Sequence, residues 1–233
     1  MSRRLVAVLV AVPVVVLVGC GAVWYTLIRD TADPEADVDA ITADGGGGDT
    51  GDGPASADGT WTVEPGDTVF VGYRVQEQFA GDTIQKTATG RTPAVEGTIT
   101  VDGDRITAAG FTADLTGLES DQARRDSALL TRGLELATYP EASFELTSPV
   151  VLPSPPARGE DVEVTATGDL TLHGQTAPVE VALEGRWEGS TISVAGSAPI
   201  AFADFGMDAI DMAGFVRTDD HGTLELQLLL VPA

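Results

Sequence analysis

The sequence is poor in the residues on which catalysis and metal binding most often depend. Among 233 residues there is one cysteine, Cys20, one lysine, Lys86, and two histidines, His173 and His221. A single cysteine allows no intrachain disulfide, so a packed core must stabilise the fold. The chain has no H-x-H, H-x-x-x-H or C-x-x-C pattern and no G-x-S-x-G segment, which argues against a zinc site and a nucleophilic serine elbow. We therefore expect no catalytic residue and no metal ligand, and a hydrolase is the least favoured function.

Positive charge is scarce as well. The chain holds 13 Lys and Arg residues against 36 Asp and Glu residues, for a formal net charge of −23. Such a chain repels nucleic acid and anionic lipid headgroups, so we expect no nucleic-acid partner. The acidic residues also lack the spacing of a calcium-binding EF-hand loop: Asp204, Asp208 and Asp211 do not fit it.

Charge is absent from one long segment near the N-terminus. Leu5 to Ile28 contains no charged residue, and as a helix its 24 residues would span about 36 Å, enough to cross a bilayer. Arg3 and Arg4 precede it and favour a cytoplasmic N-terminus. Residues 1–29 are thus expected to form a single-pass anchor in the cell membrane, with the C-terminal domain extracytoplasmic.

A lipoprotein signal is the alternative for this segment. Leu17-Val18-Gly19-Cys20 resembles a lipobox, which would make Cys20 a lipidation site. Apolar residues continue beyond Cys20, whereas a lipidated cysteine is usually followed by a polar tether, so the uncleaved span is favoured. Either anchor tethers the rest of the chain to a membrane.

Residues 30–59 are acidic and rich in glycine. They include nine acidic residues, no basic residue and seven glycines. A segment of this composition buries too little apolar surface to offset its ordering entropy, so we expect a disordered linker. Calcium binding by its aspartates is a less favoured alternative.

From Thr60 onward the dominant hydrophobic period is two residues, which is typical of strands with one buried face. Clear alternation occurs in residues 69–76, 162–172, 179–183 and 224–230, and Asp102-Gly103 and Glu188-Gly189 are good hairpin turns. About eight short strands favour an all-β antiparallel barrel or sandwich over residues 60–233. One helix is expected at Ser120–Leu134, capped by Ser120, and its few apolar residues favour a position across the barrel.

The segment Gly168–Val181, GDLTLHGQTAPVEV, joins two such strands. The first run ends at His173-Gly174, and the second is expected to begin at Pro178, since proline suits the first residue of a strand. With no nucleophile or metal ligand near it in sequence, His173 is interpreted as a turn or rim residue.

Gly168–Val179 also resembles the central motif of the YceI-like family, G-x-L-T-[IL]-[HK]-G-x-T-[KR]-P-V, with Ala177 at a position that is usually basic. Two further segments match the family in the same order. They contribute Arg125, Asp126, Tyr139, Pro140, Ala142 and Phe144 to the first match, and Asp204, Phe205, Gly206 and Met207 to the second. Ala203 stands where a basic residue is common, and Trp61 matches the start of the domain. The resemblance implies a lipocalin-like antiparallel barrel that is exported and binds isoprenoid quinones, polyisoprenoids or other long-chain amphiphiles.

A barrel of eight strands is at the size where the interior either fills with side chains or holds one small ligand. Three functions therefore stay open: a lipid carrier, which is favoured, a structural or interaction barrel with a filled core, and a hydrolase. No cofactor is expected other than a bound quinone or polyisoprenoid, and the oligomeric state stays open, a dimer included. The expected ligand-binding residues are Val69, Val71, Tyr73, Phe111, Leu115, Phe144, Leu146, Leu170, Leu172, Val181, Leu183, Leu224, Leu226 and Leu228, with Phe202, Phe205, Met207 and Phe215 near one end.

Overall fold

The computed structural model describes residues 32–44, 54–79, 84–212 and 216–233. The predicted membrane anchor at residues 1–29, with Cys20, lies outside these residues. Within the described part of the chain, no helix is both long enough and apolar enough to cross a membrane.

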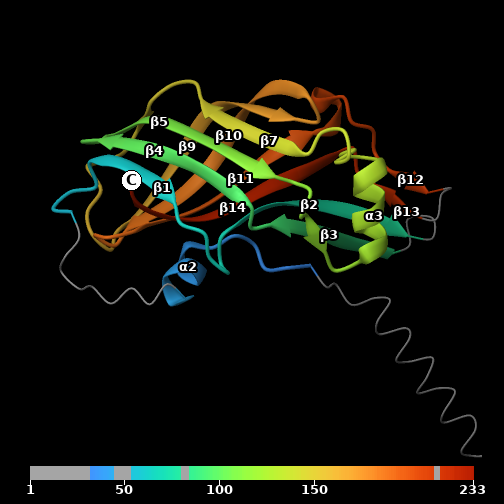
Figure 1. Cartoon of the computed structure of the whole chain (residues 1–233), viewed down its shortest axis with the longest axis horizontal. Helices are drawn as coiled ribbons and strands as arrows, with labels where there is room; N and C mark the ends of the chain where they lie inside the picture. Colours follow the sequence, from blue (N-terminus) through green and yellow to red (C-terminus); the bar gives the residue numbers. More distant parts are fainter. Residues whose placement is uncertain (1–31, 45–53, 80–83, 213–215) are drawn as a thin grey trace, which may run out of the picture. The chain divides into compact units, whose positions relative to one another are not determined.

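The described residues are mainly β (Figure 1). The strands are β1 (Gly59–Val63), β2 (Phe70–Phe79), β3 (Ile84–Thr92), β4 (Val95–Asp102), β5 (Arg105–Asp114), β6 (Glu119–Ser120), β7 (Glu141–Leu146), β8 (Val150–Val151), β9 (Asp161–Leu172), β10 (Gln175–Trp187), β11 (Ile192–Ala201), β12 (Asp211–Met212), β13 (Val216–Thr218) and β14 (His221–Pro232). The helices are α2 (Val38–Asp44), α3 (Ala123–Thr131) and the 3-10 helix η1 (Phe202–Phe205).

Eight of the strands close into an antiparallel barrel, as the sequence predicted. The order around the ring is β1, β4, β5, β7, β9, β10, β11 and β14, and β14 pairs back with β1. Strand β14 pairs with β1 through residues 230–232 and with β2 through residues 223–227. Strands β1 and β2 are therefore successive parts of one wall, and β4 and β3 are their respective partners.

The wall is incomplete at the end formed by β2 and β3. Strand β3 pairs with β2 on one side and with the two residues of β6 on the other, and α3 follows β6 along the chain. Helix α3 contributes Leu129 to the same core as the barrel strands. It therefore lies over this end of the barrel, as its sparse apolar residues indicated.

The strand alternation in the sequence sets the two faces of the wall. In β14 the leucines at 224, 226, 228 and 230 face inward, and Leu228 and Leu230 are fully buried. Trp61 of β1 packs in the same core, where its indole N–H donates to the carbonyl of Ala57 at 2.8 Å. One apolar face per strand is enough to build this core, because closure of the barrel turns all such faces inward.

The segment around His173 forms a tight hairpin between β9 and β10. His173 and Gly174 have φ angles of 52° and 70°, so both central residues are left-handed, as in the type I′ turns that match strand twist. The predicted turn is confirmed, but the prediction that the next strand begins at Pro178 was wrong, since β10 begins at Gln175. Pairing of β10 with β11 begins at Ala182, so Pro178 has a strand partner only on the β9 side and its missing N–H is tolerated.

The predicted helix is shorter than expected. Helix α3 begins at Ala123, and Gln122 stands at its N-cap without a side-chain hydrogen bond to the helix. The prediction that Ser120 caps the helix was wrong, because Ser120 pairs with Gly90 as part of β6. Its hydroxyl group instead lies 2.6 Å from the carboxylate of Asp126.

Residues 32–44 correct the expectation that residues 30–59 are disordered. This segment, here called the N-terminal strap, includes α2, which contacts β10, β11 and β14. Val38 and Ile41 of the strap are 1% and 0% exposed. The average composition hides these two apolar residues, which sit three positions apart and so share one helix face. The strap also buries the outward-facing Gln227, whose side-chain oxygen accepts a hydrogen bond from the amide of Asp37 at 3.0 Å.

Replacing Ile41 by serine should release the strap without unfolding the barrel. Burial of an isoleucine side chain contributes about 1.5–3 kcal/mol, so amide exchange in the strap should accelerate by roughly 10- to 100-fold while β9–β11 stay protected. Hydrogen exchange measured by mass spectrometry checks this. The control is Asp39→Ser, because the exposed ion pair of Asp39 with Arg186 is worth at most about 1 kcal/mol. Equal exchange rates in both variants would contradict the claim that burial of Ile41 holds the strap on the barrel.

Candidate ligand cavity

The barrel encloses an apolar cavity of about 270 Å³. Fifteen of the residues predicted to face the ligand line it. They are Val71, Tyr73, Phe111, Leu115, Phe144, Leu146, Leu170, Leu172, Val181, Leu183, Phe202, Met207, Leu224, Leu226 and Leu228. An engineered apolar cavity of about 150 Å³ stays dry and takes up benzene, so this one has room for an apolar molecule.

Two of the predicted site residues that the structure describes do not line the cavity. Val69 and Phe205 are each 1% exposed and belong to the packed core, so they lie outside the lining of this cavity. They pack against other side chains at positions where the interior is full. Phe215 lies outside the described residues.

The cavity also has lining residues that sequence reasoning missed. Leu129 and Leu134 come from α3 and the residues after it, and Ile210 comes from the segment that follows η1. These residues belong to no alternating strand pattern, so the period of two could not select them. Further lining residues from strands are Val95, Ile99, Ile106, Val179, Val194 and Ile200.

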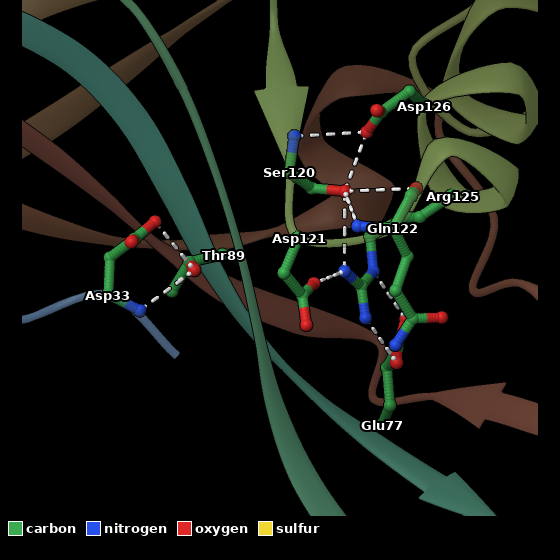
Figure 2. A network of polar contacts seen from close by, with 8 residues as sticks. All are labelled: Asp33, Glu77, Thr89, Ser120, Asp121, Gln122, Arg125 and Asp126. Carbon is green, nitrogen blue, oxygen red and sulfur yellow. Dashed lines mark hydrogen bonds and ion pairs between the residues drawn. The ribbon is translucent and has the colours of Figure 1, made fainter. Parts of the chain in front are cut away.

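One inward position of β2 carries a charge. Val71, Tyr73 and Val75 line the cavity, and the next inward residue of β2 is Glu77. The carboxylate of Glu77 accepts two hydrogen bonds from Arg125 of α3. The Nε–Oε1 distance is 3.0 Å and the Nη2–Oε2 distance is 2.9 Å (Figure 2). The two side chains are only 9% and 10% exposed. Burial acts to lower the pKa of Arg125, but its bonds to Glu77 and Asp121 outweigh this and raise the pKa, so the guanidinium stays charged.

Further hydrogen bonds tie this ion pair to β6 and α3. Arg125 also donates to Asp121 and, at 3.3 Å, to the Ser120 hydroxyl. Asp126 accepts from the Ser120 amide at 3.0 Å (Figure 2). Arg125 and Asp126 are the R-D pair of the sequence motif, and the structure gives both a role in attaching α3 to the open end of the barrel.

Tyr73 lies beside this polar network. Its hydroxyl oxygen is buried and has no hydrogen-bond partner among the described residues. The ring packs over Gly90, its partner across β2 and β3, where an added Cβ would lie 2.5 Å from the ring. Burial raises the pKa of Tyr73, with Arg125 acting in the opposite direction, so the phenol stays protonated.

The three sequence motifs meet around His173. Its Nδ1 lies 3.0 Å from the carbonyl oxygen of Phe205, and its ring contacts that of Tyr139 edge-on at a centroid distance of 4.4 Å. Its Nε2 lies 3.8 Å from the carboxylate of Glu135. The contacts of His173 thus join the turn to the segment before β7 and to η1, and they support its interpretation as a turn residue. No cluster of three potential metal ligands occurs among the residues that were described.

Replacing Gly174 by alanine should destabilise the fold by about 2–4 kcal/mol. The left-handed φ of 70° costs an alanine about 1–2 kcal/mol, and the added Cβ would lie 2.7 Å from the Tyr139 ring. The control is Gly103→Ala, which also has a left-handed φ but no atom within 4 Å of the added Cβ. Urea unfolding of both variants measures the difference, and equal losses would contradict a packing role for the Tyr139 contact.

The described strands and cavity place the protein in the structural class of closed antiparallel barrels with an apolar interior. The sequence profile of the YceI-like domain matches residues 61–230, and the chain belongs to this family. It is 27% identical to a UPF0312 protein of Vibrio cholerae over 141 residues, covering 57% of this chain and 71% of the relative. It is also 29% identical to a UPF0312 protein of Vibrio parahaemolyticus over 115 residues, covering 46% of this chain and 57% of that relative.

Solved structures share the fold. A polyisoprenoid-binding domain from Saccharophagus degradans, implicated in plant cell wall breakdown, superposes with a TM-score of 0.54 and 18% identity over 74% of this chain and 98% of that domain. BcnA of Burkholderia cenocepacia superposes with a TM-score of 0.50 and 19% identity over 67% of this chain and 95% of its own. Together they establish the lipocalin-like barrel that the sequence motifs implied.

Proposed function

We propose that this protein binds one long-chain isoprenoid or a similar amphiphilic lipid inside its barrel, for carriage or storage. The observation that carries the proposal is the cavity, whose lining is mainly apolar, with valine, leucine, isoleucine and phenylalanine as its most common residues. The polyisoprenoid-binding domain of S. degradans, which shares the fold, supports this class of ligand. The arrangement around His173 gives no support to a hydrolase.

The volume of the cavity limits how much lipid it holds. Scaling from benzene in about 150 Å³, 270 Å³ takes about 11 carbon atoms, or roughly two isoprene units. Each buried CH2 group contributes about 0.8 kcal/mol, so each buried unit adds up to about 4 kcal/mol. A longer chain must therefore widen the cavity or extend beyond it.

We further propose that residues 1–29 anchor the barrel to the outer side of the cell membrane. The support is the uncharged segment Leu5 to Ile28 after two arginines. A membrane anchor suits a protein that exchanges a water-insoluble ligand with a bilayer.

Uptake of prenols by the full-length protein tests the lipid-binding proposal. The protein is stripped of lipid in mild detergent and titrated with geraniol, farnesol and geranylgeraniol, and complexes are counted by native mass spectrometry. We expect one ligand per chain, with geraniol, which has two isoprene units, already filling the cavity, and with affinity rising only slowly to farnesol and geranylgeraniol. Failure to take up any of the three would favour the filled-core alternative.

A further inference from the structure

We propose that the hydroxyl group of Tyr73 is a polar subsite that hydrogen-bonds an uncharged oxygen in the headgroup of the bound lipid. This inference rests on the proposed function and adds to it the chemistry and orientation of the ligand. Tyr73 lines the cavity, and its hydroxyl is buried without a partner in the described part of the protein. A buried hydroxyl without a partner is unfavourable, whereas a headgroup oxygen beside it would accept a hydrogen bond from it.

The position of Tyr73 places this subsite at one end of the cavity. Its ring lies over Gly90 of β3, and Gly90 pairs with Ser120 of β6, which precedes α3. The opposite part of the lining comes from apolar residues of β4, β5 and β8, namely Ile99, Ile106 and Val150. A lipid held by Tyr73 would therefore extend its tail away from α3 and toward these residues.

The surrounding charges select a neutral headgroup. Besides burial, nearby charges shift the pKa of Tyr73. The guanidinium of Arg125 acts to lower this pKa, and three carboxylates act to raise it, those of Glu77, Asp126 and Asp121. The guanidinium of Arg125 already donates to Glu77, Asp121 and Ser120. The three carboxylates outnumber the one cation, which is already hydrogen-bonded, so we expect them to repel a phosphate. An alcohol or a quinone carbonyl carries no charge and can accept a hydrogen bond from Tyr73.

The test compares Tyr73→Phe with the unaltered full-length protein. Four probes share a C20 isoprenoid chain: geranylgeraniol, the hydrocarbon lacking its hydroxyl, a quinone carrying the same chain, and geranylgeranyl phosphate. We expect the alcohol or the quinone to bind roughly 3- to 10-fold more tightly than the hydrocarbon, which is the range for one hydrogen bond. Tyr73→Phe should abolish this preference, because phenylalanine keeps the ring and lacks the hydrogen-bond donor. The thermal midpoint should stay level or rise, because the substitution removes the unpaired hydroxyl.

Tyr139→Phe is the matched control, since Tyr139 packs on His173 and does not line the cavity, so the preference should persist. If the preference also persists in Tyr73→Phe for both the alcohol and the quinone, the subsite is refuted while lipid binding stands. Tighter binding of the phosphate than of the alcohol would refute the neutral headgroup. Failure of every probe to bind would instead refute the proposed function.

Discussion

Replacing Arg125 by alanine should lower the free energy of unfolding by about 3–5 kcal/mol. The substitution leaves the carboxylate of Glu77, which is only 9% exposed, buried on the inner face of β2 without its cation. It also removes the contacts that join α3 to β6 through Ser120 and Asp121. Urea unfolding in mild detergent, followed by tryptophan fluorescence, measures the loss.

A double variant separates the buried charge from the packing. Replacing Glu77 by leucine and Arg125 by methionine removes both charges and keeps apolar volume, and buried ion pairs are often replaced in this way at little or no loss of stability. We expect the double variant to be at least about 2 kcal/mol more stable than Arg125→Ala. A loss below about 1 kcal/mol for Arg125→Ala would show that Glu77 is readily hydrated and that α3 leaves this end of the barrel open.

Replacing Ala142 by tryptophan should reduce prenol affinity by at least about 100-fold. Ala142 lies on the inner face of β7 and lines the cavity. The indole group has nine ring atoms, and the cavity holds about 11 carbon atoms, so the indole would fill most of it. Each CH2 group of the ligand that is displaced loses about 0.8 kcal/mol of binding free energy. Titration with geranylgeraniol under native mass spectrometry measures the effect.

The control for this variant lies on the same strand. Glu145 is exposed on the outer face of β7, so Glu145→Trp adds the same ring without entering the cavity and should bind the prenol normally. Overpacking costs about 1–3 kcal/mol, so the unfolding midpoint of Ala142→Trp is measured as well. A folded Ala142→Trp protein that binds geranylgeraniol with unaltered affinity would place the ligand elsewhere.

The regular alternation was sufficient to predict an all-β domain, because each strand has one buried face, and the resemblance to the YceI-like family then favoured a barrel over a sandwich. That alternation also selected many of the residues that line the cavity, since an inward residue must face either the core or the space within it. It could not separate these two cases, and Val69 and Phe205 turned out to be packed core. The difference depends on how the walls and η1 fit together, which no local pattern records.

Features built from distant residues were missed for a related reason. In the sequence, Glu77 resembles an ordinary polar strand residue. Its ion pair with Arg125, 48 positions away, forms only because the fold brings α3 next to β2. The strap was predicted to be disordered because composition is an average, and two apolar residues among many acidic ones do not change that average. Their burial depends on the outer face of β10, β11 and β14, which exists only after the barrel has closed.

Lipid binding inside the barrel is tested most sharply by the mass of the lipid that accompanies the protein from its own membrane. The full-length protein is extracted in mild detergent, analysed intact by native mass spectrometry, and its bound lipid is then identified after release. We expect one isoprenoid lipid per chain, with an uncharged oxygen in its headgroup, and we expect no such lipid in the Ala142→Trp variant. An unaltered protein that emerges without lipid and takes up none when isoprenoids are added would contradict lipid binding inside the barrel.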